Sequence, residues 1–118
     1  MGKLARRKIA GLALVFSCIA ASTALSAEMP NLSGTTWNGS DSDGTHYTLT
    51  FKQDGSIVYK SDRETIENGS WKQYNNALYY QANKRFMEAL GEFADGKIEG
   101  TAWNIKQSSW FWKLSKAN

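Results

Sequence analysis

The feature that most constrains this chain is a strict alternation of apolar and polar residues over positions 46–52. Large apolar residues take every second position and polar ones lie between them: Tyr47, Leu49 and Phe51 alternate with His46, Thr48 and Thr50. Because successive side chains of a strand point to opposite faces, this pattern predicts a half-buried β-strand. Asp54 and Gly55 follow, a pair that favours a type I′ turn, and residues 56–60 continue with Ile57 and Tyr59 on one side. The two segments therefore predict a β-hairpin.

Runs of β-forming residues separated by turn residues continue through the rest of the chain. Further strands are expected at 34–38, 70–74, 77–81, 98–106 and 109–114. A weaker one carries Thr65 and Ile66 into a turn at Asn68 and Gly69, from which the strand 70–74 departs. The segment 39–44 is rich in Gly, Ser and Asp and is expected to be the turn between the first two strands.

The segment 83–93 is compatible with two structures. Its Lys, Arg, Met, Glu, Ala and Leu residues tolerate a helix, and Asn83 is a residue type that caps helices. Asp95 and Gly96 behind it form a pair typical of a hairpin turn into the next strand. We therefore favour a strand and keep the helix as the alternative.

Together these segments predict an all-β fold. Seven or eight strands with connections of a few residues favour a small antiparallel up-and-down barrel or a strongly curled sheet, whose closure protects strand edges. A two-sheet sandwich is the alternative. The short sequential connections favour the barrel, because sandwiches usually need longer crossings between sheets.

The first 27 residues have the composition of a signal peptide. A basic start, made of Lys3, Arg6, Arg7 and Lys8, precedes an uncharged apolar stretch over 9–25. Small residues end the stretch, so we expect cleavage after Ala27, with a signal peptide at 1–27 and a single β-barrel domain at 28–118. The protein is then periplasmic or secreted, in a bacterial host, without a stable membrane span in its mature form. A retained anchor is disfavoured because the stretch is short and diluted by Ser and Thr, and a lipoprotein modified at Cys18 is the minor alternative.

Removal of this leader changes the charge of the chain. The full sequence has 14 basic and 11 acidic residues, and four of the basic ones lie in the leader, so the mature domain has ten basic against 11 acidic residues. A domain close to neutrality gives no support for nucleic-acid binding. Cys18 is the only cysteine, so the mature domain has no disulfide and must be held by packing of its aromatic residues.

The residue inventory offers little for catalysis or metal binding. His46 is the only histidine, and although Asp41, Asp43 and nearby serines invite a triad, all lie in one short loop and strand start, so we interpret His46 as a solvent-facing residue. The acidic loop 41–44 lacks the distal Glu of an EF-hand, and with one His and no mature Cys a zinc site is disfavoured. The paired carboxylates of glycosidases have no evident counterpart in the sequence. We therefore expect no catalytic residues, no metal site and no cofactor, and we do not expect the protein to be an enzyme.

A short motif at the start of the domain resembles the first strand of calycin-type barrels, the group that includes lipocalins and avidins. Gly34 is followed by Trp37 and opens the domain, and the segment 110–113 is similar to a closing strand. The resemblance implies a barrel whose first Trp plugs its base. It departs from lipocalins in having two residues, not one, between Gly and Trp, and the polar residues that bind biotin in avidins are missing, so it implies no ligand. Related Gly and Trp pairs recur at 69–71 and 100–103, where each Trp is interpreted as closing an end of the core.

Aromatic residues are the best candidates for ligand contact. We predict a binding role for six of them: Trp37, Tyr47, Tyr59, Trp71, Tyr80 and Trp103. Plain core packing is the alternative, because an eight-stranded barrel is just wide enough for side chains or one small ligand. The sequence thus favours an exported, non-enzymatic binding module that recognises a protein partner in the manner of an inhibitor, through loops or an exposed aromatic strand. A carrier of a small, partly apolar ligand in the barrel interior is the alternative.

Overall fold

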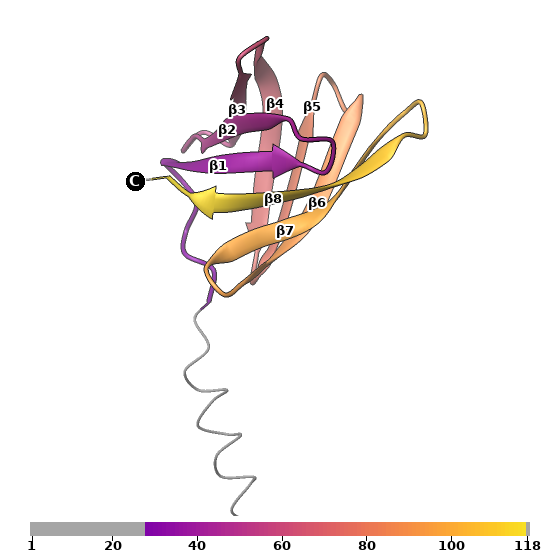
Figure 1. Ribbon diagram of the computed structural model, residues 1–118. Helices are drawn as coiled ribbons and strands as arrows, with labels where there is room; N and C mark the ends of the chain where they lie inside the picture. Colours follow the sequence, from indigo (N-terminus) through magenta and orange to yellow (C-terminus); the bar gives the residue numbers. More distant parts are fainter. Residues whose placement is uncertain (1–27, 118) are drawn as a thin grey trace, which may run out of the picture.

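The computed structural model describes residues 28–117, which fold into one closed antiparallel β-barrel (Figure 1). Each strand pairs with the next along the chain, and the first pairs with the last. The strands are β1 (Thr35–Asp41), β2 (His46–Phe51), β3 (Ser56–Ser61), β4 (Thr65–Tyr74), β5 (Ala77–Ala82), β6 (Met87–Ala94), β7 (Lys97–Asn104) and β8 (Ser109–Lys116). The predicted all-β, up-and-down barrel is therefore confirmed, while the predicted signal peptide lies outside the described residues.

The interior of the barrel is filled by the alternate positions of its strands. On β2, Tyr47, Leu49 and Phe51 are buried while His46 on the other face is exposed, as the alternation predicts. The same alternation places Leu78 and Tyr80 of β5 in the buried interior. Aromatic rings also meet across the interior; Tyr80 on β5 and Trp112 on β8, strands that do not pair, meet edge to face with ring centroids 5.4 Å apart.

Two segments predicted as turns belong instead to strands. The segment 39–41, expected to be part of a loop, continues β1, because Gly39 pairs with Tyr47 and with Leu114 on its two sides. Asn68 and Gly69, expected to break the chain, lie inside the ten-residue strand β4. There the pairing of Gly69 with Ile57 of β3 overrides the local signal for a turn, and Asn68 lies at the register shift of the β3–β4 ladder.

The ambiguous segment 83–93 divides into a turn and a strand. Residues 87–93 lie in β6, so the strand preferred over the helix is confirmed there. The first part forms the β5–β6 turn, in which Asn83, Lys84 and Arg85 all have positive φ values of 55°, 55° and 66°. Positive φ is incompatible with a right-handed helix, so this stretch is neither the predicted strand nor the alternative helix.

The two Asp-Gly turns differ in type. Asp95 and Gly96 both have positive φ, 56° and 79°, as a type I′ hairpin requires. At the other pair only Gly55 is positive, at 90°, and its backbone NH donates to the Lys52 carbonyl. That hairpin is a type I turn followed by a left-handed glycine, so the predicted type I′ turn is wrong there although the hairpin itself is present.

The N-terminal segment closes one end of the barrel. Residues 28–34 pass beneath the strands (Figure 1), and Met29 and Leu32 are buried among the core residues. Gln73 fixes the segment from both sides, accepting a hydrogen bond from the Leu32 backbone NH (3.0 Å) and donating one to the Pro30 carbonyl (2.8 Å). We call this the closed end.

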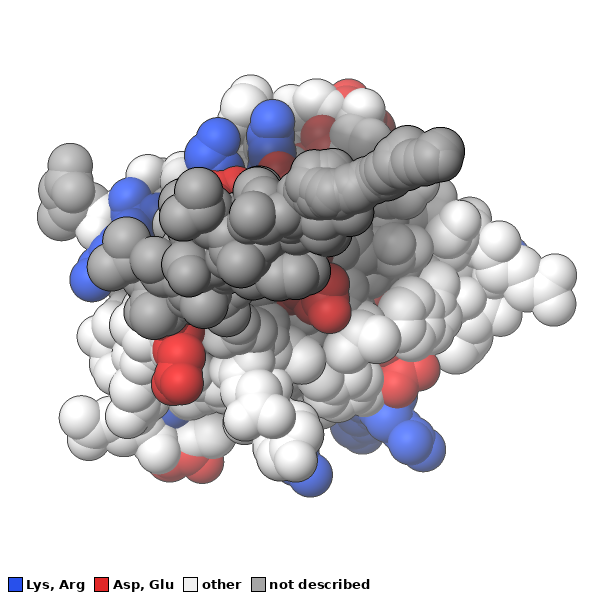
Figure 2. Space-filling view, turned by 90° about the horizontal axis from the view of Figure 1, so that it is seen from below, with Lys and Arg blue, Asp and Glu red and all other residues white. Residues whose placement is uncertain are grey.

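Charged side chains show no strong segregation on the face seen in Figure 2. Where grey atoms do not cover the surface in that view, Lys and Arg residues and Asp and Glu residues both occur at several places. Within 28–117, no helix is present that could cross a bilayer.

Candidate functional site

The opposite end of the barrel contains a pocket that reaches into the interior. This open end carries the β1–β2, β3–β4, β5–β6 and β7–β8 connections. The cavity has a volume of about 150 Å³, and we call it the inner pocket. It is lined mainly by aromatic and aliphatic side chains, with two carboxylates: Asp41, Tyr47, Leu49, Ile57, Tyr59, Glu64, Ile66, Tyr80, Ala82, Met87 and Trp110.

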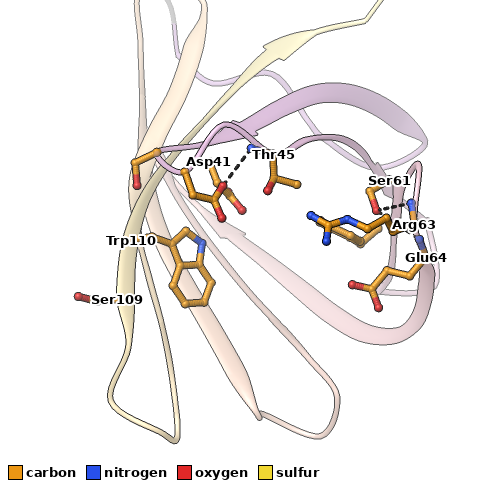
Figure 3. Close-up of a pocket in the computed structure, with 10 residues that line it drawn as sticks. Asp41, Thr45, Ser61, Arg63, Glu64, Ser109 and Trp110 are labelled. Atoms are coloured by element: carbon orange, nitrogen blue, oxygen red, sulfur yellow. Dashed lines mark hydrogen bonds between the residues drawn. The ribbon is translucent and has the colours of Figure 1, made fainter.

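A wider and more polar hollow of about 620 Å³, the outer hollow, lies above this pocket. Four residues line both spaces and form the passage between them: Asp41, Tyr59, Glu64 and Trp110. We call these four residues the throat. Figure 3 shows Asp41 and Trp110 on one wall and Arg63 and Glu64 on the other, with their side chains extending toward the space between. Two carboxylates and two aromatic rings therefore surround the entrance.

Strand alternation explains why Asp41 lies in the throat. Asp41 is two residues beyond Gly39 and four beyond buried Trp37 on β1, so it shares their inward face. Gly39 makes room for the ring of the neighbouring Tyr47, because a Cβ at Gly39 would lie 2.7 Å from Cζ of that ring. The glycine thus allows Tyr47 to lie across β1 and reach Asp41.

The Tyr47 hydroxyl donates a hydrogen bond to Oδ1 of Asp41, with a distance of 2.9 Å. Burial raises the pKa of Asp41, the bond from Tyr47 lowers it, and the nearby charge of Asp43 raises it again, with a net upward direction. None of these causes is a cation. Asp41 is therefore a half-buried carboxylate stabilised by one hydroxyl group and by no counter-charge.

The tyrosines of the pocket experience the same negative surroundings. Burial raises the pKa values of Tyr47, Tyr59 and Tyr80, and the charge of Asp41 raises each of them further. Glu64 adds to this effect at Tyr59. The three phenols are therefore neutral hydrogen-bonding groups at physiological pH, and the potential in the pocket is negative.

Arg63 is the cation of the outer hollow. It lines that hollow and is not part of the inner pocket. The pKa of Asp43 is lowered mainly by hydrogen bonds from Thr45, whose backbone NH donates to Asp43 at 2.9 Å, and the charge of Arg63 is the smallest of the causes that lower it. Arg63 thus shares the outer hollow with Asp41, but no cation is among the causes that shift the pKa of Asp41.

The structure brings half of the predicted binding residues together. Tyr47, Tyr59 and Tyr80 line the inner pocket, and the rings of the first two stack with centroids 4.8 Å apart. The tryptophans lie elsewhere. Trp37 is buried, with its indole NH donating to Thr35, and Trp71 lies toward the closed end, where it packs on Phe51.

The prediction that Trp103 closes an end of the core is wrong. Trp103 lies on the outer surface of β7 with 37% of its surface exposed. Leu90 and Phe111, exposed by 52% and 70%, lie in the neighbouring strands, where both pair with Thr101. We call these three exposed residues of β6, β7 and β8 the outer apolar face; exposed Ile105 follows β7 in the β7–β8 connection.

Sequence reasoning missed several residues of the site. Trp110, Met87, Asp41 and Glu64 line the inner pocket but were not predicted to bind. A signal for Trp110 was present, because it shares the inward period of Trp112 on β8. No local pattern identifies Glu64, which lies in the β3–β4 turn and reaches the pocket only because the barrel closes.

The residues that invited a catalytic interpretation are not assembled into a catalytic group. His46 is exposed on the outer face of β2, whereas Asp41 points inward from β1. The Ser42 hydroxyl oxygen accepts a hydrogen bond from the Phe111 backbone NH, 3.2 Å away. Within residues 28–117, no three His, Cys, Asp or Glu side chains are grouped to hold a metal ion.

Comparison of the chain with protein-family models, curated proteins and solved structures gives no match. The resemblance to calycin-type barrels therefore stays a prediction, while the eight-stranded barrel itself is a property of the structure.

Proposed function

We propose that this chain is an exported, non-enzymatic binding module that recognises a protein partner through the open end of its barrel. The observation that carries the proposal is the nesting of the inner pocket below the wider outer hollow. Pockets for drug-sized ligands usually measure about 300–1,000 Å³. The inner pocket, at about 150 Å³, is below this range.

A cavity of about 150 Å³ accommodates a benzene-sized group. That is the size of one side chain inserted by a partner, with the outer hollow receiving the surrounding backbone. Interfaces commonly concentrate their energy in one anchor residue that fills a desolvated pocket, surrounded by a more polar rim. The apolar inner pocket and the polar outer hollow have this arrangement.

The outer apolar face is a second surface suited to a protein partner, and two variants separate it from the open end. Ala82 lies in the wall of the inner pocket, so Ala82→Phe fills that space; Phe111→Ser removes the most exposed aromatic ring of the outer face. Each variant is used as bait on the exported fraction of the native host. The proposal predicts a partner held by wild type and by Phe111→Ser, and lost with Ala82→Phe. Loss of the partner with Phe111→Ser but not with Ala82→Phe would locate the binding site on the outer apolar face and overturn the proposal.

A carrier of a small ligand is the second candidate, because the walls of the inner pocket are apolar below the throat. Native mass spectrometry of the protein purified from its host distinguishes the two. A retained small molecule that Ala82→Phe excludes supports the carrier, whereas a co-purified protein with the variant pattern described above supports the binding module.

A further inference from the structure

We infer that the open end selects a positively charged group, specifically an ammonium attached to a short apolar end that enters the inner pocket. The inference rests on the proposed use of the open end and specifies the chemistry of its occupant. It is carried by the placement of two carboxylates and two aromatic rings in the throat, directly above an apolar cavity.

The first argument is the charge of the throat. Asp41 and Glu64 both face the passage, and the residues that line the inner pocket include no Lys, Arg or His. Asp41 is half-buried and receives one hydrogen bond from Tyr47. Moving a carboxylate out of water without a counter-charge costs free energy. A cation that enters the throat would supply Asp41 with the counter-charge that the lining of the inner pocket lacks.

The second argument is the chemistry of the walls. Tyr59 and Trp110 line the same passage as the two carboxylates. Cations are attracted to the faces of Tyr and Trp within about 6 Å of the ring centroid, and this attraction strengthens when water is excluded. Aromatic rings beside carboxylates thus favour an ammonium over a neutral or anionic group of the same shape.

The third argument is depth. Below the throat the lining changes to Leu49, Ile57, Ile66, Ala82 and Met87, with the Tyr47 and Tyr80 rings. This zone suits the apolar part of the occupant, not its charge. The occupant is therefore oriented, with its apolar end inside the barrel and its ammonium between Asp41 and Glu64.

The probe for this inference is 2-phenylethylammonium, compared with the neutral 2-phenylethanol and the anionic phenylacetate. Calorimetric or NMR titration of the mature protein should give binding of the cation about tenfold tighter than that of the alcohol, as expected for one desolvated charge contact with aromatic support. The anion should bind most weakly.

Asp41→Asn tests the origin of the preference. The amide oxygen still accepts the bond from Tyr47, so the fold is retained, but the charge is removed. This variant should lose most of the tenfold preference while its affinity for 2-phenylethanol stays unchanged. Glu99→Gln is the matched control, because Glu99 is exposed on β7 and lines neither the inner pocket nor the outer hollow, and it should keep the preference.

Two peptides distinguish the source of the ammonium. A short peptide beginning with a free N-terminal Phe presents the same chemistry, and its N-acetylated form removes the charge. Binding of the free peptide and not of its acetylated form supports a protein partner as the source of the ammonium; binding of the small amine but of neither peptide supports the inferred chemistry with a small molecule as the source.

The inference is overturned if cation and alcohol bind wild type equally, or if no probe binds. The proposed function is judged separately, by whether Ala82→Phe releases a captured partner. A partner lost with Ala82→Phe, together with equal binding of cation and alcohol, would preserve the open-end site and reject only its charge preference.

Discussion

The hydroxyl of Tyr47 donates to the carboxylate of Asp41 across the β1–β2 ladder, and the two oxygens are 2.9 Å apart. Tyr47 is almost fully buried, while Asp41 is only partly covered and reaches the throat. The bond therefore connects the core of the barrel to the side chain that gives the open end its charge.

Replacing Tyr47 with Phe removes this bond and preserves the ring. Hydrogen bonds to charged groups contribute about 1.5–3 kcal/mol, and because solvent can partly replace the donor at Asp41 we expect a loss of about 1–2 kcal/mol in the free energy of unfolding. Chemical denaturation at pH 7 measures it. Tyr59→Phe is the control, since no such bond links Tyr59 to Asp41, and an equal loss in both variants would contradict the assignment.

Removal of the charge of Asp41 should change how stability depends on pH. Its folded pKa is raised above 3.8, so the native state holds its proton more tightly than the unfolded state does. The stabilising contribution is therefore fully present below pH 3.8 and is lost as the pH rises through the folded pKa. The unfolding free energy of Asp41→Asn, measured relative to wild type, should accordingly increase from pH 3 to pH 7.

Asp43 provides a control of opposite sign. Hydrogen bonds from Thr45 lower its pKa, so its contribution is present above pH 3.8 and is lost as the pH falls through the folded value. Relative to wild type, Asp43→Asn should therefore become less stable as the pH rises. Denaturation curves of the two variants that move in the same direction would show that these assignments are wrong.

A side chain at Gly91 should be poorly tolerated. A Cβ there would lie 2.6 Å from the Cη2 atom of Trp112, inside the closely packed core. Overpacking of this kind typically costs about 1–3 kcal/mol, and we expect Gly91→Ala to lower the unfolding free energy by that amount. Thr101→Ala is a control on the exposed face of adjacent β7 and should change stability by less than about 0.5 kcal/mol. Thermal and chemical denaturation should both rank the variants in this order.

The sequence predicted the architecture because most strands carry the same physical signal, an alternation of apolar and polar residues between turn residues. Alternation in β2 identified its buried face without knowledge of its neighbours, and Asp95 and Gly96 identified a turn whose φ values only such residues adopt readily. The errors arose where pairing overrides local preference, as at Asn68 and Gly69 within β4.

The repeated Gly and Trp motifs show that similar sequence motifs can place their Trp side chains on opposite faces of a strand. Gly34 has a φ of 80° and lies before β1, so Trp37 is placed on the inward face by the strand that follows. Gly100 lies inside β7, and three residues later the strand presents Trp103 on the opposite, outer face. The parity of the spacing within a strand, and not the motif, decides burial.

The candidate site was only partly predictable, for the same reason. Tyr47, Tyr59 and Tyr80 could be proposed because each lies on the apolar face of a predicted strand. The throat depends on barrel closure, which brings Asp41 at the end of β1 near Glu64 in the β3–β4 turn and Trp110 on β8. Such contacts between distant segments leave no local pattern in the chain.

The closed end allows a last prediction about how the N-terminal segment stabilises the barrel. Leu32 is fully buried, and Gln73 holds the backbone on either side of it. Leu32→Ala removes buried apolar volume at the base of the core, which typically costs about 2–5 kcal/mol. Ser33→Ala, one residue further along the segment, is the matched control and should change stability by less than about 0.5 kcal/mol. Because the inner pocket lies at the opposite end, probe binding by folded Leu32→Ala should equal that of wild type. Chemical denaturation and the probe titration measure the two effects, and a variant of unchanged stability would show that residues 28–34 do not form part of the core.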